Sequence, residues 1–146
     1  MNMTEKQVIL YVRGEQYFDG IDPDGTELVT EGTMTIADDG AITLEYAETE
    51  LTGMPGTTTR FVLQNDTVTL TRSGGVNSQM IFQQGVQHSS LYETPFGTLT
   101  VDISTSRLAH RLGEHGGLLE IRYSISVEHQ VTGKNQFKIR VREKMR

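Results

Sequence analysis

Residues 119–127, L-E-I-R-Y-S-I-S-V, decide the fold class. Apolar side chains occupy every second position from Leu119 to Val127, and polar side chains fill the positions between them. Successive side chains of a β-strand point to opposite faces of the sheet. The stretch therefore predicts a strand with one buried face and one solvated face.

The same alternation recurs along the chain, and turn residues interrupt it at short intervals. The other alternating stretches are residues 8–12, 42–46, 67–71, 79–83, 98–103 and 137–142. Hairpin residues stand between them, at 38–40, 65–66, 74–75, 95–97, 116–117 and 132–134. The one candidate helix, residues 106–114, is short and ends in glycines, so we expect a strand end or a single turn there.

Short strands with one apolar face bury that face by closing into a barrel or by stacking as a sandwich. The sequence predicts an all-β fold of about eight to ten strands, a number that suits a closed or nearly closed antiparallel barrel of the lipocalin-like kind. At 146 residues, with no linker or repeat, residues 1–146 are expected to form a single domain.

Charge and composition bear on partners and compartment. The net charge of −6 disfavours nucleic acid as a partner, because an acidic surface repels phosphates. Basic residues crowd the C-terminus, where we expect an exposed strand face and a solvated tail: Lys134, Lys138, Arg140, Arg142, Lys144 and Arg146. The chain has no cysteine, no signal-like N-terminus and no apolar run of the roughly 20 residues that a membrane helix needs. We therefore expect a cytoplasmic protein that does not associate with membranes.

No motif for catalysis, metal binding or cofactor binding is present. The stretch from His110 to His115 is one residue too long for the H-x-x-E-H zinc motif, and Gly113 argues against the helix that this motif needs. No phosphate-binding glycine loop and no G-x-S-x-G elbow occur. We name no catalytic residue, metal or cofactor, and whether the protein is an enzyme stays open, with the balance against it.

Several polar side chains continue the apolar faces. Arg72 follows Val68 and Leu70, and Thr105 and Arg107 follow Ile103. A buried charge is costly unless it is paired, so we expect these side chains at a barrel mouth, where two guanidinium groups suit a carboxylate or phosphate.

The alternative is that twist, a bulge or a strand end carries both arginines into solvent. Tyr46 and Tyr123 also lie on apolar stripes, where they are binding-site candidates or ordinary core tyrosines. His129 extends one stripe too, but it is close to a hairpin and is expected to be exposed.

Four segments carry a resemblance to a known family. They are Leu70-Thr71-Arg72-Ser73-Gly74, Met80-Ile81-Phe82, the turn Tyr92-Glu93-Thr94-Pro95-Phe96-Gly97, and the long final hairpin after Gly116-Gly117. Together they resemble the YwiB-like family of small bacterial proteins, a domain of unknown function. The resemblance implies a calycin-like β-barrel, related in shape to lipocalins, and no established activity.

Two functions remain in view. The first is a binding module that holds a small anionic or amphipathic ligand at the barrel mouth, with Arg72, Arg107, Thr105, Tyr123 and Tyr46 as candidate site residues. The second is a protein-interaction module with a filled barrel, meeting its partner through a strand edge or outer face. The oligomeric state stays open.

Overall fold

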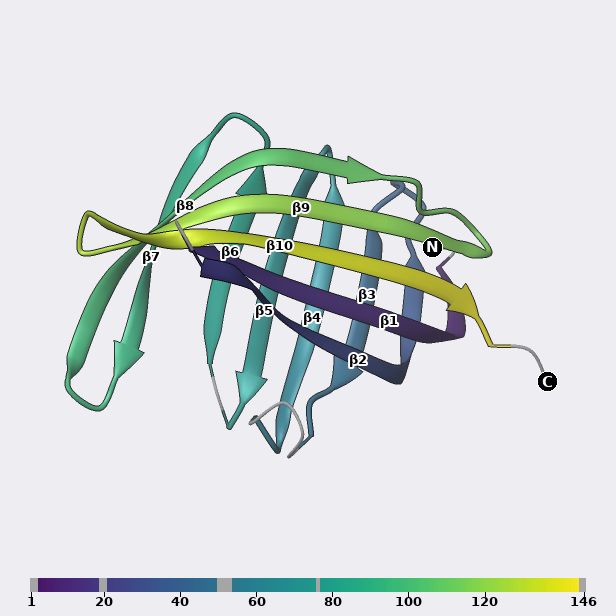
Figure 1. The fold of residues 1–146 in the computed structure, drawn as a ribbon. Coiled ribbons are helices and arrows are strands. Elements are labelled where there is room, and N and C mark those ends of the chain that lie inside the picture. The colour runs from purple at the N-terminus through teal and green to yellow at the C-terminus, as the bar shows by residue number, and fades with distance from the viewer. Residues whose placement is uncertain (1–2, 19–20, 50–53, 76, 145–146) are drawn as a thin grey trace.

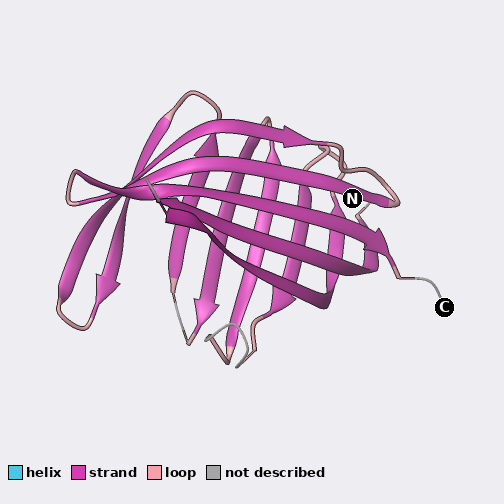
Figure 2. Ribbon diagram, in the orientation of Figure 1, coloured by secondary structure: helices cyan, strands magenta, loops and turns pink. Residues whose placement is uncertain are grey.

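A computed structural model describes residues 3–18, 21–49, 54–75 and 77–144. It places ten β-strands and no helix in these residues, which confirms the all-β prediction (Figure 2). The strands are β1 (Thr4–Phe18), β2 (Ile21–Ile36), β3 (Ile42–Ala47), β4 (Thr57–Gln64), β5 (Thr67–Gly74), β6 (Ser78–Gln83), β7 (Gln87–Thr94), β8 (Gly97–His110), β9 (Gly116–Val127) and β10 (Gln130–Glu143). Since no helix is present in the described residues, none of them forms a helical membrane span.

All ten strands belong to one antiparallel sheet in the order β6-β5-β4-β3-β2-β1-β10-β9-β8-β7. The sheet curls so that β8, β9, β10, β1 and β2 form a front wall and β3 to β6 cross behind it at a steep angle (Figure 1). No ladder joins β6 to β7, but the turn between them reaches β8, where the Gly85 amide donates to the Thr105 carbonyl over 2.9 Å. The predicted nearly closed barrel is thus confirmed.

The apolar faces meet between the two walls. On β9, Leu119, Ile121 and Tyr123 are buried and Ile125 is half-buried, as the alternation predicts. The largest fully buried side chains come from both walls: Phe61, Phe82, Leu10, Met34, Leu44, Leu70, Ile103, Leu119, Ile121 and Ile139. One shared core therefore lies inside the barrel.

Turn chemistry explains where the strands end. Asn65 and Asp66 both have positive φ, 52° and 60°, which is the geometry of a tight hairpin between β4 and β5. Residues 106–110 belong to the end of β8, as expected, and are not helical. The basic side chains at the C-terminus are exposed, again as expected, namely Lys134, Lys138, Arg140, Arg142 and Lys144, while Arg146 lies outside the described residues.

Candidate functional site

Arg72 lies on the inward face of β5, after the buried Val68 and Leu70. Its register partner on β4 is the fully buried Thr59. The Arg72 Nε is buried and donates to no atom of the described chain. A buried donor without an acceptor costs about 1–3 kcal/mol, and more when the group is charged. The interior of the barrel therefore contains a cationic group with unmet hydrogen-bonding capacity.

Two tyrosines approach this guanidinium from opposite walls. Burial raises the pKa of Tyr46, on β3, and of Tyr123, on β9, well above the ordinary value of a phenol. In both cases the charge of Arg72 opposes the shift and lowers the pKa. Because such an effect requires proximity, Arg72 brings the two walls together at one polar cluster.

Glu48 is a member of this cluster that sequence reasoning missed. Glutamate is almost never fully buried unless it is paired, yet this residue is only 6% exposed. Its Oε1 accepts a hydrogen bond from the Thr59 hydroxyl over 2.6 Å, and its carboxyl also bonds the Tyr46 hydroxyl. The sequence does contain a pattern that indicates its inward position, because Glu48 extends the alternation of Ile42, Leu44 and Tyr46 by one step.

Thr105 joins the cluster from β8, opposite Tyr123 in the register. It is 3% exposed, and its hydroxyl is buried with no partner among the described residues. Tyr123 in turn packs on two aromatic rings, with ring centroids 4.7 Å from Phe82 and 5.8 Å from Phe137. The structure thus places Arg72, Tyr46, Thr105 and Tyr123 around the same interior.

Arg107 does not belong to it, and the prediction that it continues the inward face of β8 is wrong. The register shifts between Thr105 and Arg107, so a β-bulge moves Arg107 to the outer face opposite Arg122. Its side chain is 54% exposed, and its Nε lies 3.5 Å from the Glu120 Oε1. Leu108 takes the inward position opposite Ile121 instead. The expected pair of inward arginines is therefore absent.

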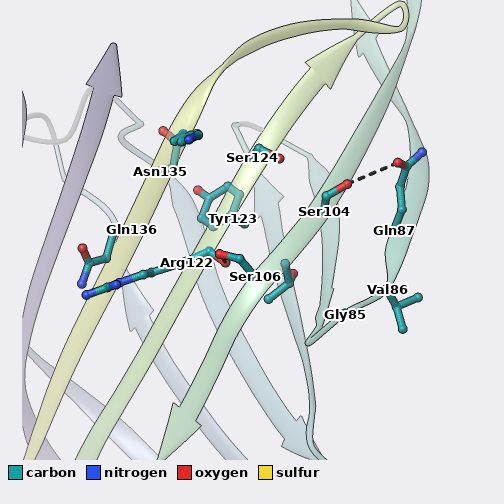
Figure 3. Close-up of a pocket in the computed structure, with 12 residues that line it drawn as sticks. Gly85, Val86, Gln87, Ser104, Ser106, Arg122, Tyr123, Ser124, Asn135 and Gln136 are labelled. Atoms are coloured by element: carbon teal, nitrogen blue, oxygen red, sulfur yellow. Dashed lines mark hydrogen bonds between the residues drawn. The ribbon is translucent and has the colours of Figure 1, made fainter. Parts of the chain in front are cut away.

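Two cavities adjoin the Tyr123 side of the cluster. The larger, about 730 Å³, lies where β8, β9 and β10 pass the turn between β6 and β7, and Thr105 and Tyr123 are among its lining residues (Figure 3). A hydrogen bond of 3.2 Å from the Ser104 hydroxyl to the Gln87 side chain crosses its wall. The smaller, about 360 Å³, shares Tyr123, Asn135 and Gln136 with it. A small molecule has room beside the polar cluster.

The histidines stand apart from this site. His129 is 80% exposed, as expected, with its Nδ1 3.4 Å from the Asp102 Oδ2. His110 bonds Asp66 and His115 bonds Glu143 at the surface. Within the described ranges, no three His, Asp or Glu side chains are grouped closely enough to hold a metal ion.

These features define an all-β protein with a nearly closed barrel and a polar cluster in its interior. The chain belongs to the family DUF1934, a domain of unknown function, whose model matches residues 11–139. Its fold is similar to that of the ywiB protein from Bacillus subtilis, with a TM-score of 0.83 and 23% sequence identity over 98% of this chain and 96% of that chain. No curated protein matches the sequence. The YwiB-like resemblance is confirmed.

Proposed function

We propose that this protein is a binding module that holds the anionic group of a small ligand inside the barrel, with Arg72 as the residue that recognises it. The observation that carries the proposal is the buried Arg72 Nε, which has no acceptor in the described chain. A planar guanidinium matches a carboxylate or a phosphate, and a bound anion supplies the missing acceptor.

The cavities on the Tyr123 side of the cluster, which Arg72 itself does not line, suit a ligand that is both polar and apolar. The two cavity volumes, 730 and 360 Å³, lie within the range of small-molecule sites, about 300–1,000 Å³. Tyr123 and Phe137 offer aromatic surface to these cavities, and the Thr105 hydroxyl offers a further polar contact. The ligand in this proposal is therefore an amphipathic carboxylate or phosphate. We place the protein in the cytoplasm in this proposal, because a chain without cysteine is suited to a reducing compartment.

A filled barrel that serves only as a protein-interaction module is the second candidate. The packing of Phe61 against Phe137, with ring centroids 6.1 Å apart, favours it because these rings occupy the interior. The two candidates differ in one consequence. Only a ligand-binding barrel gains stability from a small anion.

A thermal-shift screen against small carboxylates and phosphates separates the two candidates. Ligand that binds the native state stabilises it by about 2.7 kcal/mol at a concentration of 100 times Kd. We expect at least one anion to raise the Tm of the wild type in a concentration-dependent way, and Arg72→Met to abolish the increase. Arg107→Met is the matched control, since it removes an exposed arginine and should respond like the wild type.

Two results contradict the proposal. If no anion raises the Tm of the wild type, the filled barrel is favoured. If Arg72→Met and the wild type respond alike, the anion binds elsewhere.

A further inference from the structure

The outer face of β10 has three consecutive outward positions occupied by cations. Lys138, Arg140 and Arg142 are all exposed, and they alternate with the inward Ile139 and Val141, which are buried. The backbone positions that carry successive charges are about 6.8 Å apart, twice the rise per residue of a strand. We call these three residues the basic stripe. It lies in the front wall of the barrel, between β1 and β9 (Figure 1).

The basic stripe forms no ion pair with the described residues, although several other cations do. The reason is that the neighbouring carboxylates are engaged elsewhere. Glu120, opposite Lys138, contacts Arg107 and Arg122 and accepts from Gln136. Other carboxylates of the front wall have cationic partners of their own, among them Glu15 and Glu27 with Arg13, Glu31 with Lys144 and Glu143 with Lys6. The stripe therefore keeps its positive charge on a protein whose net charge is −6.

Exposed apolar side chains border the centre of the stripe. Tyr11 on β1 and Leu118 on β9 are the two register partners of Arg140, and they are 36% and 37% exposed. Val29, the partner of Tyr11 on β2, is 63% exposed. A row of apolar surface thus crosses the line of charges at Arg140, and both features face outward on the same wall.

We propose that the basic stripe is a docking surface for an extended acidic segment of a protein partner, in which Asp or Glu alternates with apolar residues. An extended peptide repeats its side chains on one face about every 6.8 Å, the same spacing as the stripe. Its carboxylates meet the three cations, and the residues between them point away from the barrel, because alternate side chains of an extended chain lie on opposite faces. The backbone of the segment passes between Tyr11 and Leu118, the two register partners of Arg140.

The surface suits other polyanions less well. Single-stranded nucleic acid binds on aromatic stacking platforms, and the stripe has one flanking aromatic, Tyr11, only 36% exposed. An anionic membrane would meet the exposed Glu27 and Glu31 of β2, two strands from the stripe, as well as its cations. A narrow acidic chain touches the cations and avoids those carboxylates.

Fluorescence anisotropy with a labelled peptide of alternating glutamate and valine tests the proposal. The stripe variant carries Lys138→Gln, Arg140→Gln and Arg142→Gln. The control variant carries Arg60→Gln, Arg111→Gln and Lys134→Gln, which change the net charge equally at exposed sites outside the stripe. We expect low-salt binding to the wild type and the control, and binding about tenfold weaker to the stripe variant, since each exposed charge pair contributes modestly.

The comparison probes are a glutamine–valine peptide, oligothymidine and phosphatidylserine vesicles. The proposal is overturned if the wild type binds the glutamine peptide as tightly as the glutamate peptide, if the two variants weaken binding equally, or if oligothymidine or vesicles bind more tightly. A second measurement needs no variant. Amide NMR shifts of the wild type on adding the glutamate peptide should concentrate in β1, β9 and β10, and shifts confined to β3–β6 would contradict the proposal.

Discussion

Tyr46 and Tyr123 give the interior a measurable response to pH. Burial is the first cause of the raised pKa of each, so both phenols stay protonated in the native state. In the unfolded chain they ionise near pH 10. The native state then binds more protons than the unfolded state, and the free energy of unfolding falls as the pH rises above about 10.

We therefore expect Tyr46 and Tyr123 to ionise only when the barrel unfolds at alkaline pH. Phenolate absorbance and circular dichroism, followed together, measure this. Tyr123→Phe removes one delayed phenol, while Tyr11→Phe, at a partly exposed position, should leave the delayed phenols unchanged. Ionisation of all five tyrosines before the circular dichroism changes would show that the tyrosines are accessible.

The Glu48 side chain and the Arg72 Nε are both buried beside Tyr46, and no ion pair joins them among the described residues. Removing one charge leaves the other uncompensated, whereas removing both removes the desolvation cost of each. We expect Arg72→Met combined with Glu48→Gln to be at least as stable to urea as the wild type, and Glu48→Gln alone to be less stable. A double variant that loses more stability than the sum of the two single variants would contradict this account.

At the level of single strands, β9 offers a direct test of which face is buried. Ile121 is fully buried, whereas Leu118, near the start of the same strand, is 37% exposed. Truncating a buried aliphatic side chain costs about 2–5 kcal/mol, because contacts are lost and a cavity remains. We expect Ile121→Ala to lose that much in urea unfolding and Leu118→Ala to stay within about 0.5 kcal/mol of the wild type. Similar losses from both would show that β9 does not divide into a buried and an exposed face.

The strands were predictable because their signal is local and strong. Alternation along residues 119–127 follows from the two faces of a strand, and the Asn65-Asp66 turn follows from its tolerance of positive φ. The position of Arg107 was not predictable, because a bulge adds one residue and reverses the side-chain alternation without a marked sequence signal. Glu48 was overlooked for the opposite reason. The alternation extends to Glu48, but carboxylates are usually solvated, so a buried one is not expected from the sequence.

The contact between side chains of the two walls could not be predicted from the sequence either. Which inward residues become neighbours depends on strand order and on the steep crossing of the two walls, and both are set by long-range pairing (Figure 1). Arg72 on β5 and Tyr123 on β9 are far apart in the chain, and nothing local indicates that they share an environment. The resemblance to a known family predicted the barrel, but it did not predict that Arg72 and Tyr123 lie close together.

At the scale of the whole molecule, the barrel closes at a seam between β6 and the second half of β8. No ladder forms there, and single hydrogen bonds take its place. The Leu108 amide donates to the Gln84 side-chain oxygen over 2.9 Å, and His110 lies 3.1 Å from Asp66 in the turn that joins β4 to β5. Closure therefore depends on a few hydrogen bonds, these two and the backbone bond from Gly85 to Thr105, in contrast to the continuous backbone ladders elsewhere in the sheet.

This difference predicts where the barrel opens first. Gln84→Ala removes the acceptor of the Leu108 amide, which should exchange with solvent faster, at a cost of about 1 kcal/mol in global stability. The Ile121 amide lies in the middle of the front wall, between β8 and β10, and its exchange should change only in proportion to that global loss. Gln64→Ala is the matched control, because its side chain bonds Asp39, in the turn between β2 and β3, and not β8. Hydrogen exchange followed by NMR measures the Leu108 and Ile121 amides in the wild type and in both variants. Unchanged exchange of the Leu108 amide in Gln84→Ala would mean that the Gln84 side chain does not hold the barrel closed.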